Sequence, residues 1–131
     1  MKKVDVVGAV IFDNVQRKYL ATMRDKEKHQ GGLWEFPGGK IEEGEKPEAA
    51  LIREIEEELN CTIKVEKLLV DHTHEYPDLK VRLITYLCSI ESGTPKLTEH
   101  ESMKWVNKED LPKLMWAEAD IPTVDHIIKR L

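Results

Sequence analysis

The chain has 131 residues, of which 40% are hydrophobic and 34% are charged with both signs mixed, and this composition predicts one folded domain over residues 1–131. The net charge of -5 argues against a nucleic-acid polymer as partner, because such binding normally needs a clustered basic surface. A polyanionic small-molecule partner would therefore need local help, from a metal ion or from a few placed cations.

The N-terminus carries two lysines and then a short apolar run, Val6 to Phe12. This run is far shorter than the roughly 20 apolar residues that cross a bilayer, and it lacks a small-residue cleavage site. We therefore expect no membrane segment and a cytoplasmic protein. Cys61 and Cys88 lack the spacing of metal ligands, so we expect two reduced thiols.

Two apolar runs, Val4 to Phe12 and Tyr19 to Arg24, flank a polar loop and predict a β-hairpin. The polar segment 25–32 ends in two glycines and is expected to be a loop. Residues 33–36 are apolar and aromatic, and Pro37-Gly38-Gly39 is expected to turn the backbone directly after them.

Pro47 suits the first turn of a helix that is predicted to run to Leu59, where Asn60 can end it in the left-handed conformation. Strands are predicted over residues 63–70, 81–90 and 102–106. Asn107 is expected to cap a short helix through Leu114, and a last helix near residues 122–131 carries an apolar stripe. This order predicts an α/β fold, with helices packed on the faces of a mixed sheet.

The helix over residues 47–59 carries Glu54, Glu57 and Glu58 on one face, opposite its apolar stripe. Like charges at this spacing repel one another, so the cluster calls for an explanation. Mg²⁺ supplies one, since it prefers oxygen ligands and is usually completed by substrate phosphates. The alternative is an acidic helix face that is simply solvated.

The stretch from Gly39 to Cys61 resembles the Nudix box, G-x5-E-x7-R-E-U-x-E-E-x-G-U, in which U is a bulky aliphatic residue. The positions that match are Gly39, Glu45, Arg53, Glu54, Ile55, Glu57 and Glu58. Asn60 replaces the glycine and Cys61 the last aliphatic residue, and both are physically compatible with those places. The resemblance implies a Nudix-type α/β/α sandwich that hydrolyses nucleoside diphosphate linkages.

The resemblance also implies the residues of a metal and catalytic site. Mg²⁺, with Mn²⁺ as a substitute, would be held by Glu54, Glu57, Glu58 and the backbone carbonyl of Gly38. Glu54 is the first choice for the general base. Glu99, six residues before a tryptophan, would be a further ligand or the second choice for the base, unless it is a surface residue and Glu101 is the true counterpart.

Other positions of the resemblance concern the loop and the substrate. Arg53 belongs to the catalytic set, mainly as a brace for the loop, and Lys40 either caps this assembly or reaches a phosphate. The candidates for substrate binding are Arg24, Glu35, Lys40 and Asp120. Arg24 has an alternative interpretation as an ordinary strand-end arginine. Asp120 would accept hydrogen bonds from a base edge, or else would cap the last helix. Trp116 would stack on a base or fill the core.

The segment 33–40 resembles the entry to the box in MutT-type and CTP-pyrophosphohydrolase-type Nudix enzymes. This resemblance implies a nucleoside triphosphate pyrophosphohydrolase that acts on CTP, dCTP or oxidised nucleotides such as 8-oxo-dGTP and releases a nucleoside monophosphate and pyrophosphate. One alternative is hydrolysis of ADP-ribose or a dinucleoside polyphosphate, and another is a nucleotide-binding regulator without turnover. The partner is a nucleotide in each case, and either a monomer or a homodimer is compatible with the sequence.

Overall fold

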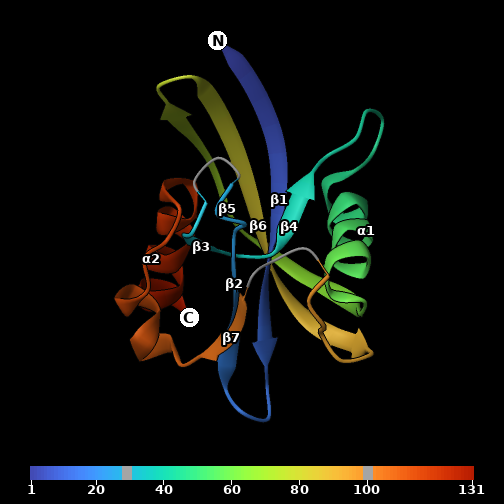
Figure 1. Ribbon diagram of the computed structural model, residues 1–131. Coiled ribbons are helices and arrows are strands. Elements are labelled where there is room, and N and C mark those ends of the chain that lie inside the picture. The colour runs from blue at the N-terminus through green and yellow to red at the C-terminus, as the bar shows by residue number, and fades with distance from the viewer. Residues whose placement is uncertain (28–30, 99–101) are drawn as a thin grey trace.

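The computed structural model describes residues 1–27, 31–98 and 102–131. Its elements in chain order are β1 (Lys2–Asp13), β2 (Lys18–Met23), β3 (Trp34–Glu35), β4 (Gly38–Lys40), α1 (Pro47–Leu59), β5 (Thr62–Tyr76), β6 (Leu79–Ser92), β7 (Ser102–Val106), the 3-10 helices η1 (Lys108–Lys113) and η2 (Glu118–Asp120), and α2 (Ile121–Arg130). The strands form a mixed sheet that lies between α1 and α2 (Figure 1). The predicted α/β architecture is confirmed.

Strand β1 lies at the centre of the sheet. The order of the strands is β3-β2-β1-β6-β5. Strand β1 runs parallel to β6 and antiparallel to β2, and the predicted hairpin is confirmed by the pairing of Phe12 with Tyr19. The short strand β4 also pairs with β1, so that Gly38 lies opposite Gly8 and Gly39 opposite Val7. The first residues of the box therefore lie beside the centre of the sheet.

Alternation along β1 divides the core between the two faces of the sheet. Val7 and Ile11 belong to the cluster that contains the buried side of α1, while Val10 packs with Val124 and Ile127 of α2. On α1 the predicted apolar stripe is confirmed, because Leu51, Ile55 and Leu59 are fully buried. Burial of this stripe orients the opposite, acidic face of α1.

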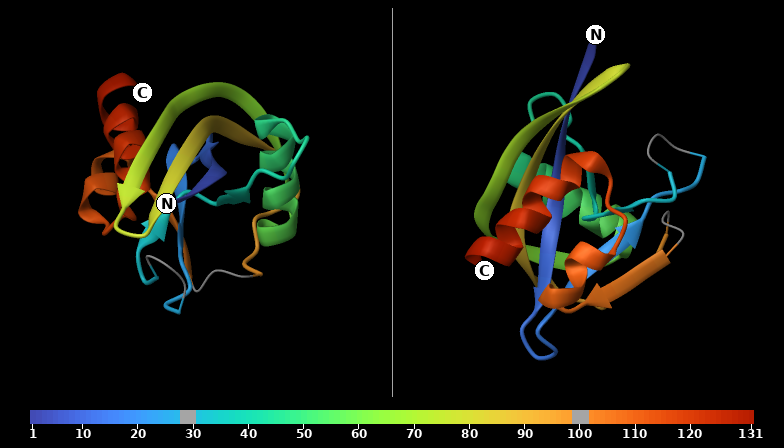
Figure 2. Two further views of the ribbon diagram at one scale, coloured as in Figure 1. Left: turned by 90° about the horizontal axis from the view of Figure 1, so that it is seen from above. Right: turned by 90° about the vertical axis from the view of Figure 1, so that its left-hand side faces the viewer.

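Strands β5 and β6 extend well beyond the predicted ranges 63–70 and 81–90. They form a long curved hairpin (Figure 2), with register shifts along β5 of the kind that bends and twists a strand. The apolar run of β5 ends at Val70, but backbone pairing with β6 continues to Tyr76 through residues that are partly polar. An apolar pattern alone therefore predicts too short a strand.

Three further predictions concern local backbone conformation. Asn60 ends α1 in the left-handed conformation, with φ of 53° and ψ of 40°, as predicted. The backbone turn predicted at Pro37-Gly38-Gly39 is confirmed at Pro37, where the chain bends, but is wrong for the two glycines, which belong to β4. Asn107 stands before η1, which is a 3-10 helix, and its side chain makes no capping hydrogen bond.

Both cysteines are buried and free, so the predicted reduced thiols are confirmed. Burial raises the pKa of the Cys88 thiol to about 12, and it also raises the pKa of Cys61. Neither residue contributes to a metal-binding group among the described residues. None of the described helices is both long enough and apolar enough to cross a membrane.

Candidate active site

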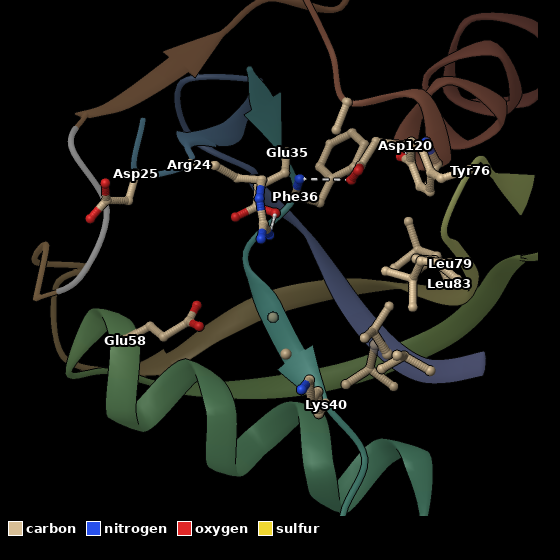
Figure 3. Close-up of a pocket in the computed structure, with 18 of the residues that line it drawn as sticks. Arg24, Asp25, Glu35, Phe36, Lys40, Glu58, Tyr76, Leu79, Leu83 and Asp120 are labelled. Atoms are coloured by element: carbon tan, nitrogen blue, oxygen red, sulfur yellow. Dashed lines mark hydrogen bonds and ion pairs between the residues drawn. The ribbon is translucent and has the colours of Figure 1, made fainter. Parts of the chain in front are cut away.

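The acidic face of α1 lies against the glycines of β4. The carboxylate of Glu54 touches Gly39 so closely that a Cβ on that glycine would stand 2.8 Å from Oε1 of Glu54 and still closer to Oε2. The Glu54 side chain is only 15% exposed, whereas the side chain of Glu57 is 57% exposed. Glu58 is buried, and its side chain projects from α1 toward the pocket (Figure 3).

The two glycines of β4 are required because the backbone of β4 lies very close to its neighbours, and not because the chain turns at them. A Cβ on Gly38 would overlap the carbonyl oxygen of Val7 and would stand 2.9 Å from Cα of Gly8. Neither Gly38 nor Gly39 has a positive φ, so close approach of two backbones is what requires glycine here. This approach brings the backbone of β4 beside the helix carboxylates.

Arg53 ties the loop before α1 to the helix. Its guanidinium donates to both carboxylate oxygens of Glu45, at 2.8 and 3.0 Å, and to the backbone carbonyl of Lys40 at 3.1 Å. These bonds, with the backbone N–H of Glu42, lower the pKa of Glu45 to about 2. Glu45 is therefore ionised at neutral pH. The loop is held by a rigid two-pronged contact, as the sequence analysis expects of a brace.

Arg53 also contacts the acidic face directly. Its Nη1 donates to Oε1 of Glu54 at 2.9 Å and lies 3.4 Å from both carboxylate oxygens of Glu57. In this structure a fixed cation thus offsets part of the repulsion among the carboxylates. It also sets the orientation of the Glu54 carboxylate, since Arg53 and Gly39 confine it from two sides.

The oxygen atoms gathered between α1 and β4 are suitable ligands for a hard cation such as Mg²⁺. Glu58 lines the pocket together with Gly38 and Gly39, and Glu54 lies against Gly39. The atoms that these residues could offer to a cation are carboxylate and backbone carbonyl oxygens, which Mg²⁺ prefers over nitrogen and sulfur. Among the described residues, no three acidic, histidine or cysteine side chains converge on one point as they would around a bound metal.

The last turn of α1 is fixed from outside the helix. Thr98 donates from its hydroxyl to the backbone carbonyls of Glu57 and Glu58, at 3.0 and 2.7 Å, and the N–H of Lys96 donates to the carbonyl of Leu59 at 2.7 Å. These bonds satisfy carbonyls that a helix end otherwise leaves open. The two candidate ligands Glu57 and Glu58 therefore stand on a rigid turn. Glu99 and Glu101 lie outside the described residues.

A cavity of about 550 Å³ extends from β4 and α1 along β1 and β6 to η2. One end is polar and contains Gly38 with Gly39, Lys40 and Glu58 of the box, and Arg24 and Glu35 lie between this end and the other (Figure 3). The other end is walled by apolar side chains, with Tyr76 and Asp120 beside them (Figure 3). The residues of this wall are Val4, Val6, Leu79, Val81, Leu83 and Ala119.

The sequence analysis missed this wall, although period-two alternation on the two strands was a usable signal. Alternate side chains of paired strands share one face, so Val4 and Val6 of β1 stand beside Leu79, Val81 and Leu83 of β6. The missing information was the parallel pairing of β1 with β6. The sequences of β1 and β6, which are far apart in the chain, contain no pattern that identifies the two strands as neighbours.

Arg24 and Glu35 form an ion pair inside the cavity. Nη1 of Arg24 lies 2.8 Å from Oε1 of Glu35, and their side chains are 30% and 16% exposed. Burial acts to lower the pKa of the Arg24 guanidinium, but the Glu35 carboxylate outweighs it and the pKa is raised. Arg24 is thus held in the cavity by a specific partner.

Asp120 is 5% exposed and accepts a hydrogen bond from the backbone N–H of Phe36 at 3.0 Å. The capping role considered for this side chain is wrong, because Asp120 precedes α2 but makes no capping bond. The side chain does not cap α2 because its carboxylate accepts from the N–H of Phe36. In addition, Pro122 in the first turn of α2 has no N–H to donate. Asp120 faces the cavity instead.

Burial raises the pKa of Asp120 well above its ordinary value, and the Glu35 carboxylate raises it further, while the N–H of Phe36 acts to lower it. The raised pKa extends the pH range in which this carboxyl group is neutral and can donate one hydrogen bond, whereas the ionised form expected from the sequence only accepts hydrogen bonds.

This pKa shift has a measurable effect on stability. A carboxyl group whose pKa is raised by folding stabilises the fold below its unfolded pKa of about 3.9, and this contribution is lost as pH rises through the folded pKa. Asp120→Asn removes the titration but keeps an oxygen acceptor for the N–H of Phe36. We expect the variant to gain stability relative to the unsubstituted protein as pH rises from 4 to 8. Urea unfolding of both proteins in EDTA measures this difference, and a difference that stays constant with pH would contradict the shift.

The structure places Trp116 in the core, outside the residues that line the cavity. Its ring stacks on Phe36 at a centroid distance of 4.7 Å, and its indole N–H donates to the carbonyl of Leu111 at 2.7 Å. The indole is 7% exposed. Of the two roles considered for Trp116, the structure supports core packing.

A NUDIX domain model matches residues 2–127, and the chain therefore belongs to the Nudix family. The CTP pyrophosphohydrolase of Escherichia coli (strain K12) is 34% identical over 125 residues, which cover 95% of this chain and 91% of the relative. The 8-oxo-dGTP diphosphatase of Proteus vulgaris is 40% identical over 86 residues, 66% of this chain and 76% of the relative. The solution NMR structure of the DNA mismatch repair protein MutT (family Nudix hydrolase) from methicillin-resistant Staphylococcus aureus 252 aligns with a TM-score of 0.81 and 43% identity, covering 100% of both chains.

Proposed function

We propose that this Nudix hydrolase is a nucleoside triphosphate pyrophosphohydrolase, which converts a nucleoside triphosphate and water into a nucleoside monophosphate and pyrophosphate. The observation that carries the proposal is the shape of the cavity. Its polar end is lined by Gly39, Lys40 and Glu58 of the box, and its other end combines an apolar wall with the buried Asp120. Such a cavity suits a ligand with a polyanionic tail and a flat, partly apolar head.

Nudix hydrolases generally use divalent metal cations, and we propose Mg²⁺ here, with Mn²⁺ as a substitute. Glu54, Glu57 and Glu58 would hold it with the backbone carbonyl of Gly38. When bound, the cation would polarise the phosphoanhydride and lower the pKa of a water molecule. The surrounding backbone contacts preorganise the donors, because Arg53, Thr98 and the β4 glycines already fix the turns from which they project.

Glu54 is our first candidate for the group that removes the proton from water. Its carboxylate is largely shielded from solvent and is held between Arg53 and Gly39, so its position is well defined. A general base must first lie in the correct position relative to the water molecule, and a suitable pKa is the second requirement. Glu99 is the second candidate by its place in the sequence. Arg53 serves the catalytic set as a positioning residue.

The substrate would lie along the cavity with its phosphates beside β4. Lys40 lines this end and supplies a cation to a phosphate. Arg24, held by Glu35, supplies a second fixed cation between the two ends. Asp120 would meet the polar edge of the base. We propose CTP, dCTP and 8-oxo-dGTP as the nucleotides to consider, in line with the substrates that name the two relatives.

The two alternative functions fit less well. ADP-ribose and dinucleoside polyphosphates carry a second bulky group, whereas the cavity of about 550 Å³ is of a size for one compact ligand. A nucleotide-binding regulator would not need to retain the whole acidic set of the box. Glu54, Glu57 and Glu58 are all present, and two of them are shielded from solvent.

The decisive experiment offers Mg²⁺ and a panel of CTP, dCTP, GTP, 8-oxo-dGTP, ADP-ribose and diadenosine tetraphosphate to the purified protein. We expect the triphosphates to yield a monophosphate and pyrophosphate, with no orthophosphate. Release of orthophosphate, or turnover of ADP-ribose alone, would replace the proposed reaction by another Nudix reaction. Binding of nucleotide without turnover of any compound would favour the regulator.

Metal binding is expected to raise the melting temperature. Mg²⁺ would bind the folded helix face in preference to the unfolded chain, and at 100 times its dissociation constant it would add about 2.7 kcal/mol of stability. Glu57→Gln is expected to reduce this gain, whereas Glu56→Gln on the same helix should preserve it. Thermal unfolding with EDTA and with increasing Mg²⁺ measures the effect. Equal gains in the two variants would remove Glu57 from the metal site.

A further inference from the structure

The 3-10 helix η2 (Glu118–Asp120) is anchored at each of its three residues. Oε2 of Glu118 lies 2.7 Å from Nε2 of His74, the N–H of Ala119 donates to the hydroxyl of Tyr76 at 3.0 Å, and Asp120 accepts from the N–H of Phe36. The first two anchors come from the end of β5. The third joins η2 to the segment between β3 and β4.

The two β5 anchors are also joined to each other. The rings of His74 and Tyr76 meet edge to face, with centroids 4.6 Å apart, and Tyr76 is 4% exposed. His74 can move little without disturbing Tyr76 or Glu118. Tyr76 lines the cavity beside Asp120, whereas His74 and Glu118 lie outside the residues that line it. The His74–Glu118 contact outside the cavity is thus linked through Tyr76 to the inside of the cavity.

We propose that His74 and Glu118 are positioning residues for base recognition, acting through Tyr76 and η2 on the carboxyl group of Asp120. This inference rests on the proposed function, because it assigns Asp120 to the base of the nucleotide. His74 and Glu118 hold η2 in register with Phe36, so that the Asp120 carboxyl presents one fixed set of hydrogen bonds. A side chain that touches no substrate thereby contributes to the choice of substrate.

The first test compares His74→Ala with two matched variants. His72→Ala removes the same ring type two residues earlier on β5. The ring centroid of His72 lies 6.0 Å from that of His74, and none of the hydrogen bonds of η2 among the described residues comes from His72, so this variant tests whether loss of a neighbouring ring is enough. His74→Gln keeps a nitrogen donor at a similar reach. We expect His74→Ala to change the ratio of kcat/KM between CTP and 8-oxo-dGTP by about fivefold to tenfold, the usual worth of one hydrogen bond.

This change should appear in KM, with kcat altered by less than about twofold, because the box residues remain in place. His74→Gln should restore the ratio and His72→Ala should leave it unchanged. In an Asp120→Ala background, His74→Ala should have no further effect on the ratio, since the residue through which it acts is gone. An unchanged ratio in His74→Ala, or effects of His74→Ala and Asp120→Ala that multiply independently, would overturn the inference.

A second readout separates this inference from the proposed function. The amide NMR signals of Phe36 and Ala119 report the two hydrogen bonds at η2 directly, with no substrate present. We expect both signals to shift in His74→Ala and to stay in place in His72→Ala. If no nucleotide is turned over, the proposed function fails and the NMR comparison alone decides the positioning role. If the two amide signals do not shift in His74→Ala, His74 does not position η2 and the inference is wrong.

Discussion

Glu54→Gln is expected to lower kcat by about 10³-fold, equivalent to about 4 kcal/mol of barrier, without unfolding the protein. The substitution keeps the size of the side chain and an oxygen acceptor for Arg53, but it removes the negative charge and the basic oxygen. Glu57→Gln should cost about 10²-fold, because the more exposed Glu57 would lose only its charge toward the metal. Initial rates with pyrophosphate detection measure both losses.

Glu56→Gln is the matched control for these variants. Glu56 belongs to the same helix, is exposed and lies 3.5 Å from the hydroxyl of Thr62, away from the glycines of β4. Its variant should retain kcat within about twofold. Glu99→Gln tests the second candidate for the general base. A loss in Glu99→Gln much larger than that in Glu54→Gln would transfer the role to Glu99.

Gly38→Ala is expected to cost about 3 kcal/mol of stability, because its Cβ would collide with the carbonyl group of Val7, which belongs to the backbone of the central strand. Backbone atoms inside a sheet cannot rotate away. Gly39→Ala should cost less, about 1 kcal/mol, because the three atoms nearest to its Cβ would all belong to the Glu54 side chain, which can give way at the expense of its contact with Arg53. Urea unfolding in EDTA measures both values.

Activity should follow the opposite order to stability in the two glycine variants. Gly39→Ala displaces the Glu54 carboxylate, and misplacement of a catalytic group by about 1 Å can cost 10²-fold in kcat. In Gly38→Ala the Glu54 carboxylate keeps its place and only the backbone carbonyl of Gly38 would shift among the proposed metal ligands, so the folded fraction should retain more of its activity. Full kcat in Gly39→Ala would show that the position of Glu54 against β4 is unimportant for turnover.

The sequence predicted α1 and its acidic face well, because both depend on local periodicity. Leu51, Ile55 and Leu59 recur at helical spacing, and this recurrence also sets the direction of Glu54, Glu57 and Glu58. The end of the helix at Asn60 was equally local. These features need no knowledge of which strands are neighbours, and the same is true of the hairpin between β1 and β2.

The base end of the cavity could be predicted only in part. Asp120 was named from the resemblance, but its contact with Phe36 joins positions 84 residues apart in the chain. The burial that raises the pKa of Asp120 depends on the packing of η2 against Phe36, which no local pattern records. The same holds for His74 and Glu118, which are separated by 44 residues. The glycines of β4 were misjudged because a glycine pair predicts a turn as readily as a close approach of strands.

The burial of the two thiols has a consequence for the chemical durability of the protein. Oxidants attack the thiolate form of cysteine, and a pKa of about 12 leaves almost no thiolate at Cys88 at neutral pH. Cys61 is likewise buried with a raised pKa. A fold that keeps both thiols protonated and covered would protect the protein against inactivation by oxidants.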